Sequence, residues 1–279
     1  MKEYNSPMKR NAYSWISRDA RTGGLVFFAP HRTKRFGKKT GGCSFCPKGL
    51  NSKKVLARAG SFLSVANSYP IFVTDGSGVY GRQELIVEGR EHAKQLASWD
   101  ARRIEKLLAF YAGRFRRAFR DRRITSVLLY KNEGKNAGAT QLHPHAQLWA
   151  MSVTGPLGGR PTTTRGIPFF EDRHVTATVP EGPFDHEVRI TTKRRAHDFG
   201  QLTAAERRSV AEALTLCFRY VRRKKLDFNF FMYSTRKRGE RFELRFVPRE
   251  GVFAGAELGS GLYVNSTDTA QAAKDYTHE

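Results

Sequence analysis

The residues best suited to chemistry lie in the segment NEGKNAGATQLHPHAQLWA, residues 132–150. Side chains alternate between the faces of a β-strand, so His143, His145 and Gln147 are predicted to share one face, about 6.6 to 6.8 Å apart. Proline donates no ladder hydrogen bond, so Pro144 indicates an edge strand that is open to a ligand. The glycine-rich residues before it can turn several backbone N–H groups toward an anion. These features favour a phosphate-sized site with two imidazoles beside it.

A second motif, GGCSFCPKG, places Cys43 and Cys46 at the spacing of metal-binding thiolates. Two thiolates and two imidazole nitrogens form a closed tetrahedral zinc site. A redox-active CxxC usually follows a strand and opens a helix, whereas Pro47 and Gly49 predict a loop here. The sequence has no second CxxC, so the missing ligands would be histidines. Spacing alone does not choose among them, and two free thiols in a loop remain the alternative. The candidates include His31, His92 and His143.

A third motif, APHRTKRF, follows the apolar run LVFFA. The guanidinium groups of Arg32 and Arg35 could each bind two phosphate oxygens. An ordinary basic loop explains this stretch equally well.

Two segments of the chain, starting at Tyr80 and Phe184, resemble each other. Each is predicted to form a strand, a connector with a histidine, a helix and another strand. The expected helices carry apolar stripes with helical spacing. These stripes are Ile104, Leu107, Leu108, Tyr111 and Phe115 in the first copy, and Val210, Leu214, Cys217 and Val221 in the second. A duplicated α+β half-domain is therefore expected.

The two predicted halves are residues 1–155, with the CxxC and HPHxQ motifs, and residues 156–279, without the histidines. The Gly-, Pro- and Thr-rich run MSVTGPLGGRPTTTRGIP is expected to connect them. The second copy has RFELRFVPRE where the first has QLHPHAQLWA. Because one copy lacks the histidines, they are dispensable for folding, which favours a functional role.

The composition is that of a folded globular protein, with 39% hydrophobic and 12% aromatic residues. No apolar run approaches the roughly 18 to 20 residues that a membrane helix requires. The first fifteen residues lack the apolar core of a secretory signal. Three cysteines, two of them in a CxxC, favour a reducing cytoplasm.

The formal net charge of +23 predicts attraction to polyanions or to phosphate-rich small ligands. Residues 1–60 contain fourteen Lys and Arg against two acids, a local charge of +12. A basic surface that selects no partner is one explanation, and an RNA or DNA partner is another. No RNA-binding signature or helix-turn-helix pattern supports the latter.

Taken in order, these motifs resemble the galactose-1-phosphate uridylyltransferase branch of the histidine-triad (HIT) superfamily over nearly the whole chain. PHRTKR resembles its arginine motif, CSFC its zinc knuckle, ANSYP its nucleoside loop, and NEGKNAGATQLHPHAQLWA its active-site loop and strand. The tail AGAELGSGLYVNSTDTAQAA is most similar to that of ADP-glucose phosphorylase-like members. The resemblance implies an α+β fold of two tandem HIT-like half-domains, each an antiparallel sheet with a packed helix.

The resemblance also implies a role for each matching residue. His145 matches the nucleophile, and one structural Zn²⁺ is implied. The implied zinc ligands are Cys43, Cys46, His92 and His143. Gln147 matches the residue that binds the transferred phosphoryl group, which Asn132 and Thr140 also line. Arg32 and Arg35 match phosphate-binding arginines, and Asn67 matches a nucleoside contact.

The implied activity is that of a nucleotidyltransferase working through a covalent nucleotidyl-His145. It moves a nucleoside monophosphate between a nucleotide sugar, or a dinucleotide, and a sugar phosphate or phosphate. A homodimer is implied as well. The alternative is a basic, nucleic-acid-associated protein on the same fold.

Three departures from the family pattern are visible in the sequence. FELRF replaces an H-x-H that binds another metal, so a second metal site is not expected. Ser68 replaces the aspartate of the nucleoside loop, and GVFAGAE lacks the lysine ahead of Gly-x-Glu. These changes predict a substrate other than that of an ordinary galactose enzyme.

Overall fold

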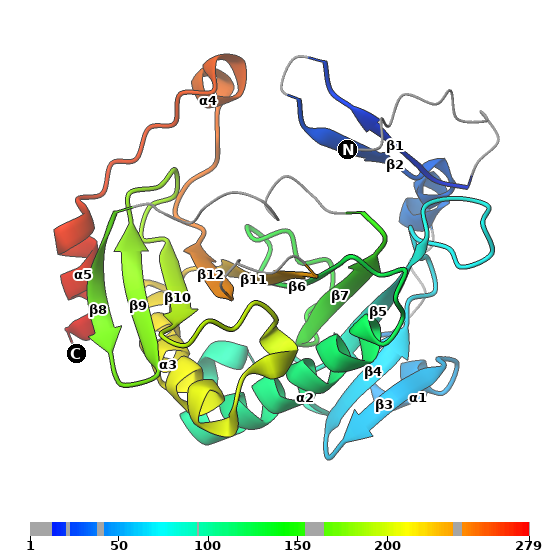
Figure 1. Ribbon diagram of the computed structural model, residues 1–279, viewed down its shortest axis with the longest axis horizontal. Coiled ribbons are helices and arrows are strands. Elements are labelled where there is room, and N and C mark those ends of the chain that lie inside the picture. Colours follow the sequence, from blue (N-terminus) through cyan, green and yellow to red (C-terminus); the bar gives the residue numbers. More distant parts are fainter. Residues whose placement is uncertain are drawn as a thin grey trace.

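A mixed α+β architecture carries both halves of the chain (Figure 1). The computed structural model describes residues 13–20, 23–37, 42–93, 95–153, 165–236 and 242–278, except the side chains of 34–37. Within these residues, ten antiparallel strands form one sheet, and the two long helices lie on one of its faces. The predicted fold class is confirmed.

The strand order of the large sheet is symmetric about its middle. The order is β3 (Val55–Ala59), β4 (Phe62–Ala66), β5 (Gly81–Val87), β7 (His145–Met151), β6 (Ser126–Glu133), β11 (Phe228–Thr235), β12 (Glu243–Pro248), β10 (Val188–Thr192), β9 (Val175–Pro180) and β8 (Gly166–Glu171). Read outward from β6 and β11, each half shows the same order, as a duplication predicts. The predicted boundary at 155/156 lies outside the described residues and stays a prediction.

The central pair of strands joins the two halves directly. β6 and β11 pair from Ser126 opposite Thr235 to Glu133 opposite Phe228. In this register Asn132 lies opposite Asn229. Residues at the start of β11 therefore lie beside the loop that follows β6, which carries candidate site residues.

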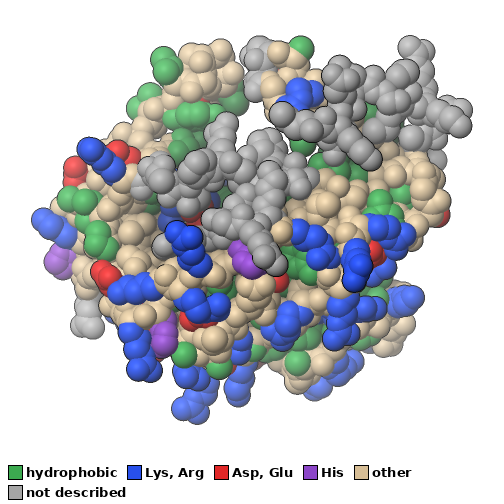
Figure 2. Space-filling model, in the orientation of Figure 1, with side chains coloured by type: hydrophobic (Ala, Val, Ile, Leu, Met, Phe, Trp, Pro, Cys, Tyr) green, Lys and Arg blue, Asp and Glu red, His purple; other side chains and the backbone are tan. Residues whose placement is uncertain are grey.

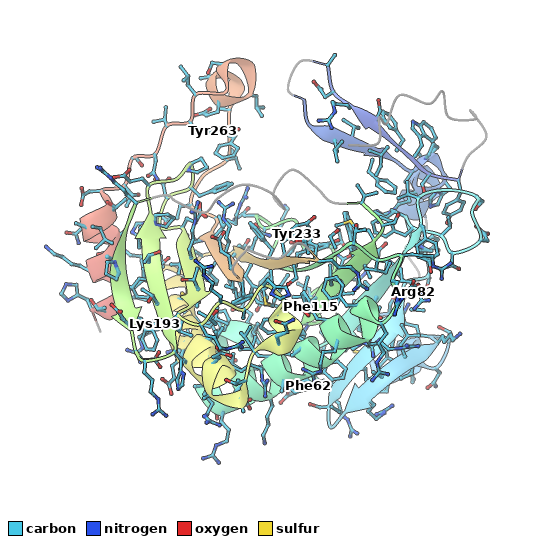
Figure 3. The ribbon with its side chains drawn as sticks, in the orientation of Figure 1. Phe62, Arg82, Phe115, Lys193, Tyr233 and Tyr263 are labelled. Atoms are coloured by element: carbon cyan, nitrogen blue, oxygen red, sulfur yellow. The ribbon has the colours of Figure 1, made fainter. Side chains whose placement is uncertain are left out.

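The helices α2 (Ala101–Phe119) and α3 (Ala204–Lys224) cover one face of the sheet. The Asp100 side chain caps α2 by accepting from the N–H of Arg103, and Thr203 and Glu206 form a capping box at the start of α3. Every residue of both predicted apolar stripes is buried, with an exposed fraction of 1% or less. Figure 3 shows Phe115 on α2. The sequence pattern therefore identified the sheet-facing side of each helix.

An N-terminal hairpin lies apart from the large sheet (Figure 1). It consists of β1 (Trp15–Arg18) and β2 (Leu25–Phe28), and the 3₁₀ helix η1 (Pro30–Gly37) follows. His31 stacks on Tyr13, and its two ring nitrogens contact the carbonyl oxygens of Tyr13 and Pro70 at 3.1 and 2.9 Å. His31 therefore tethers the hairpin to the loop at Pro70. It lies outside the cluster formed by Cys43, Cys46, His92 and His143.

The C-terminal segment forms α4 (Gly255–Ser260) and α5 (Thr269–Thr277), and α5 contacts α3, β8 and β9. His186 joins α5 to the rest of the second half. Its Nδ1 lies 2.9 Å from a Glu250 carboxylate oxygen, and its Nε2 lies 3.0 Å from one of Asp275. Burial lowers the pKa of His186, but these two carboxylates outweigh burial and raise the pKa above its usual 6.5.

We expect stability to fall as His186 deprotonates. A raised folded-state pKa means that the contribution of His186 is complete below pH 6.5 and is lost as pH rises through the folded value. The His186→Asn variant tolerates the left-handed φ of 50° but cannot become cationic. Denaturant unfolding from about pH 5.5 to about pH 8.5 should show a flatter profile in this variant than in wild type. A His174→Asn control should keep the wild-type slope. Equal slopes in wild type and His186→Asn would contradict the assignment.

In the described part of the chain, every helix is too short or too polar to cross a bilayer.

Candidate active site and metal centre

The HPHAQ segment lies in the interior of the sheet. β7 begins at His145 and pairs with β5 on one side and β6 on the other. The predicted edge strand is therefore wrong. Pro144 precedes the strand, so its missing N–H removes no ladder bond, and its carbonyl accepts from the N–H of Glu88 at 3.1 Å. Because His143 also precedes the strand, strand alternation relates only His145 to Gln147.

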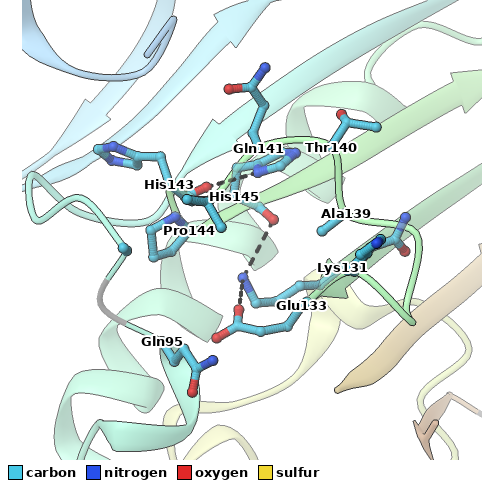
Figure 4. A pocket seen from close by; sticks show the side chains of 14 residues that line it. Gln95, Lys131, Glu133, Ala139, Thr140, Gln141, His143, Pro144 and His145 are labelled. Atoms are coloured by element: carbon cyan, nitrogen blue, oxygen red, sulfur yellow. Dashed lines mark hydrogen bonds and ion pairs between the residues drawn. The ribbon is translucent and has the colours of Figure 1, made fainter. Parts of the chain in front are cut away.

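A hydrogen bond to the backbone holds the His145 ring in one orientation. Its Nδ1 lies 3.0 Å from the carbonyl oxygen of His143 (Figure 4). A carbonyl only accepts, so Nδ1 carries the hydrogen, and Nε2 carries the lone pair of the neutral ring. The Phe45 ring packs against the imidazole with centroids 4.9 Å apart. This arrangement presents one nitrogen as a nucleophile.

Four predicted ligands converge into one metal-binding group: Cys43, Cys46, His92 and His143. One ligand atom of each residue lies within 4.8 Å of the others. The Cys46 sulfur is 3.5 Å from His92 Nδ1 and 3.7 Å from His143 Nδ1. In a tetrahedral zinc site with ordinary bond lengths, sulfur and nitrogen ligands stand about 3.6 Å apart. The donor atoms and their spacing therefore fit a four-coordinate metal ion.

Hydrogen bonding and burial around the cluster favour protonation states that can bind a cation. His143 Nε2 lies 2.9 Å from the Gly89 carbonyl, so Nε2 carries the hydrogen and Nδ1 keeps its lone pair toward the sulfurs. Burial lowers the pKa of His143, which favours the neutral, ligating form. Burial and the adjacent Cys43 thiol raise the pKa of Cys46. A bound cation would reverse this last effect by stabilising the thiolates.

A pocket of about 310 Å³ opens beside His145. The loop between β6 and β7 forms much of its wall, including Thr140, and Asn132 near the end of β6 also lines it. Gly134 and Gly138 in this loop have φ values of 87° and 80°, which favour glycine. The predicted glycine-rich loop thus lies next to the predicted nucleophile.

A carboxylate from the second half supports this loop. Asp227 accepts from the N–H of Asn136 at 2.7 Å. A Cβ added at Gly134 would lie 1.8 Å from an Asp227 carboxylate oxygen. Gly134 is therefore needed both for its backbone conformation and for this close approach.

A buried ionic network lies beneath the strand that carries His145. The Lys131 amino group contacts Glu88 at 2.5 Å, Glu133 at 2.8 Å and the carbonyl oxygen of His145 at 3.4 Å (Figure 4 shows the last two). The Tyr111 hydroxyl donates to the other oxygen of Glu88. Burial raises the pKa of Glu88. Burial also opposes the charge of Lys131, but the two carboxylates outweigh it and raise the pKa of Lys131.

We expect Lys131→Met to destabilise the fold by about 3–5 kcal/mol, because it leaves the carboxylate of Glu88 buried without its cation. Lys131 and Glu88 have fully buried side chains. Chemical denaturation measures the loss, and Lys135→Met at an exposed lysine of the site loop is the control. Adding Glu88→Gln should recover part of the stability. A Lys131→Met protein as stable as wild type would contradict this role.

The remaining predicted site residues are more dispersed. Gln147 contacts Gln83, with Gln83 Nε2 donating to Gln147 Oε1 at 3.2 Å. Asn67 accepts from the N–H of Tyr69 at 2.9 Å, which shapes its own turn. Asn67, Arg32 and Gln147 do not line the 310 Å³ pocket. The side chain of Arg35 lies outside the described residues.

The strand FELRF of the second half carries an ion pair in place of histidines. Arg245 Nε donates to a carboxylate oxygen of the buried Glu187 at 2.5 Å. Across the described residues, the cluster around Cys43 is the one such metal-binding group found. Arg245 takes the place of His145 when RFELRFVPRE is aligned with QLHPHAQLWA. The second copy therefore has a paired arginine at the nucleophile position.

Sequence reasoning missed several residues that support the site. Phe45 lies between the two cysteines, and an aromatic residue there was a usable signal. Lys131 interrupts the apolar strand VLLYKNE, and a cation inside a predicted central strand implies a buried counter-charge. Asp227 and Asn229 gave no such signal, because their importance depends on the pairing of β6 with β11.

Comparisons with known proteins agree with this arrangement. Residues 29–153 match the family model described as the domain of unknown function (DUF4931) N-terminal domain. ADP-glucose phosphorylase from Arabidopsis thaliana is 22% identical over 225 residues, which cover 70% of this chain. Galactose-1-phosphate uridylyltransferase from Thermotoga maritima is 23% identical over 207 residues, which cover 62% of this chain. Each alignment spans 64% of the curated relative's length.

A solved structure of the Arabidopsis thaliana ADP-glucose phosphorylase with bound ADP-glucose superposes with a TM-score of 0.76 at 21% identity. It covers 95% of this chain and 99% of that chain. This chain has the fold of that phosphorylase. The resemblance inferred from the motifs is thereby confirmed.

Proposed function

We propose that this protein is a nucleotidyltransferase that moves a nucleoside monophosphate between a nucleotide sugar, or a dinucleotide, and a phosphate-bearing acceptor. The observation that carries the proposal is the orientation of His145. Its Nδ1–H donates to the His143 carbonyl oxygen, so Nε2 is the ring nitrogen that carries the lone pair of the neutral imidazole. The similarity to ADP-glucose phosphorylase and to galactose-1-phosphate uridylyltransferase supports this chemistry.

The proposed reaction has two displacements at one phosphorus atom. Nε2 of His145 attacks the α-phosphorus, the P–N bond forms, and the bond to the leaving phosphate oxygen breaks. A sugar phosphate or inorganic phosphate then attacks the same phosphorus and releases His145. The protein contributes mainly position and hydrogen-bond donors for the non-bridging oxygens. Gln147, Thr140 and Asn132 are the proposed donors.

Binding of the substrate involves a second group of residues. Arg32 and Arg35 are the proposed phosphate ligands, and Asn67 is the proposed nucleoside contact. The His31 tether supports this placement, because it holds the hairpin that precedes Arg32 against Pro70, three residues after Asn67. Ser68, in place of an aspartate, makes ribose recognition different from that of the uridylyltransferases.

The metal that the cluster would hold is proposed to be one structural zinc ion. Cys43, Cys46, His92 and His143 supply four protein ligands, which leaves no position for a substrate. Bound zinc stabilises the knuckle and takes no part in the displacements. Two thiolate ligands require reduced cysteines, so we place the protein in a reducing cytoplasm.

The test of the function is the intact mass of the protein after brief incubation with a donor. UDP-glucose, ADP-glucose, UDP-galactose and a dinucleoside tetraphosphate are supplied in turn. A gain of one nucleoside monophosphate, removed on adding sugar phosphate or phosphate, supports the proposal and identifies the base. The absence of an adduct with all four donors would count against it.

A homodimer is the proposed assembly. The segment around α4 presents exposed apolar side chains, among them Val252 at 77%, Leu262 at 75% and Val264 at 73% exposure. Tyr263 on the same segment stands away from the sheet (Figure 3). Contiguous exposed apolar residues favour a protein interface. A second copy is the occupant that the resemblance implies.

We expect Leu262→Asp to shift the protein from dimer to monomer, because it places a charge in the apolar contact. Analytical ultracentrifugation measures the change, and Thr277→Asp at an exposed position on α5 is the control. A wild-type protein that sediments as a monomer would remove the dimer proposal.

The alternative of a nucleic-acid partner rests on charge. Figure 2 shows Lys and Arg side chains gathered over the part of the surface where α2 and α3 run. None of the relatives named above is described as a nucleic-acid-binding protein. Nucleotide chemistry therefore remains the proposal.

A further inference from the structure

Two proposed phosphoryl contacts, Asn132 and Gln147, are side-chain amides that can face an anion in opposite ways. Their NH₂ end donates and their oxygen end accepts, and the two ends are nearly equal in size. Phosphoryl oxygens only accept, so an amide oxygen turned toward them would repel the substrate. Shape alone does not select the productive orientation.

The orientation of Gln147 is fixed by a hydrogen-bond chain that starts at a backbone group. The N–H of Ile71 donates to Oε1 of Gln83 at 3.2 Å. Because a backbone N–H can only donate, the amide oxygen of Gln83 must face Ile71. Its Nε2 then donates to Oε1 of Gln147 at 3.2 Å. The NH₂ end of Gln147 is thereby directed away from Gln83. Gln83 is 5% exposed, so little water competes for these bonds.

The orientation of Asn132 is fixed in the same manner from the second half of the chain. Nδ2 of Asn229 donates to the carbonyl oxygen of Ala137 at 2.9 Å. Because a backbone carbonyl can only accept, the NH₂ end of Asn229 must face this side. The same Nδ2 donates to Oδ1 of Asn132 at 2.9 Å. The NH₂ end of Asn132 is left to face the site loop near Gly138.

We propose that Gln83 and Asn229 are positioning residues that set the polarity of Gln147 and Asn132, so that both amides present NH₂ donors to the transferred phosphoryl group. This inference rests on the proposed nucleotidyl transfer. It gives the second half, which lacks the histidines, a function in the site through Asn229. It also links the loop at Ile71 to the phosphoryl contact through Gln83.

The test compares three side chains of similar size at each position. Gln83→Met and Asn229→Leu remove the orienting hydrogen bond and leave the neighbouring amide able to rotate. Gln83→Glu and Asn229→Asp place a carboxylate there, which only accepts and turns the neighbouring NH₂ end toward itself. We expect the rate of His145 nucleotidylation to fall about tenfold in the apolar variants and about a hundredfold in the carboxylate variants.

The order of nucleotidylation rates among the variants distinguishes an effect of amide orientation from a loss of structural support. The rates are compared for proteins whose unfolding temperatures are matched to wild type or corrected for the folded fraction. A structural role alone predicts equal losses, or a larger loss for the apolar variants, and either result would overturn the proposal. KM should change less than kcat, because the donors act on charge that is redistributed in the transition state.

A binding measurement distinguishes this inference from the proposed function. Calorimetry with AMP and UMP requires no turnover. We expect the order of affinities among the variants to match the order of their nucleotidylation rates. If wild type forms no adduct but the order holds in binding, the proposed transfer fails, and the result supports only an orientation of the two amides toward a bound phosphate. If wild type forms the adduct and the order is absent, the inference fails alone. A wild-type protein that neither binds these nucleotides nor forms an adduct would remove both.

Discussion

His145→Ala is expected to form no nucleotidyl adduct and to lose turnover by on the order of 10⁴-fold or more. The variant removes the atom that forms the bond to phosphorus, so no change in substrate concentration restores the rate. No second nucleophile is available at the corresponding position of the other half, because Arg245 occupies it. Loss of the adduct and loss of turnover should therefore occur together.

The experiment follows adduct formation by intact mass and turnover by product release. His197→Ala is the matched control, because His197 lies in the second-half connector and contacts Gln201 instead of the site. It should behave as wild type. Circular dichroism and thermal unfolding establish that His145→Ala is folded. Turnover within tenfold of wild type in a folded His145→Ala protein would refute the covalent mechanism.

The second large effect is expected from Cys43→Ser. Metal content should fall from about one ion per chain to about none, since a structural site needs all its ligands. The knuckle carries Phe45, whose ring packs on His145, and the His143 ligand supplies the carbonyl that orients the same ring. Loss of the metal should therefore disturb the position of the His145 ring and slow adduct formation by about 10- to 100-fold.

Elemental analysis gives the metal content, and the intact-mass assay gives the rate. Cys217→Ala is the control, because this fully buried thiol lies on α3 outside the cluster. It should keep its metal and its adduct rate, with a modest loss of thermal stability. A Cys43→Ser protein that retains one ion per chain would refute the proposed ligand set. Retained metal-free activity would refute the link from the knuckle to His145.

Local sequence patterns predicted the secondary elements because each pattern acts over a few residues. The stripes that include Leu107 and Val210 gave the buried faces of α2 and α3. The similarity between the two segments gave the duplicated strand order. Pro144 led to the wrong prediction of an edge strand, because a proline argues against a central strand only if it lies within that strand. Here the strand begins one residue later, and a boundary shift of that size is beyond what sequence determines.

The sequence alone identified the donor types for the proposed metal and phosphoryl sites, since Cys43, Cys46 and the two histidines of HPH are chemically distinctive wherever they lie. Spacing did not determine which residues meet, and only the family resemblance pointed to His92 and His143. His92 joins the cysteines, and His31 does not, because long-range strand pairing sets those distances. The orientation of His145, the buried charge of Lys131 and the contacts of Asn229 were likewise decided by tertiary structure. Hydrogen bonding in a buried site depends on neighbours far apart in the chain, and a local pattern carries no information about them.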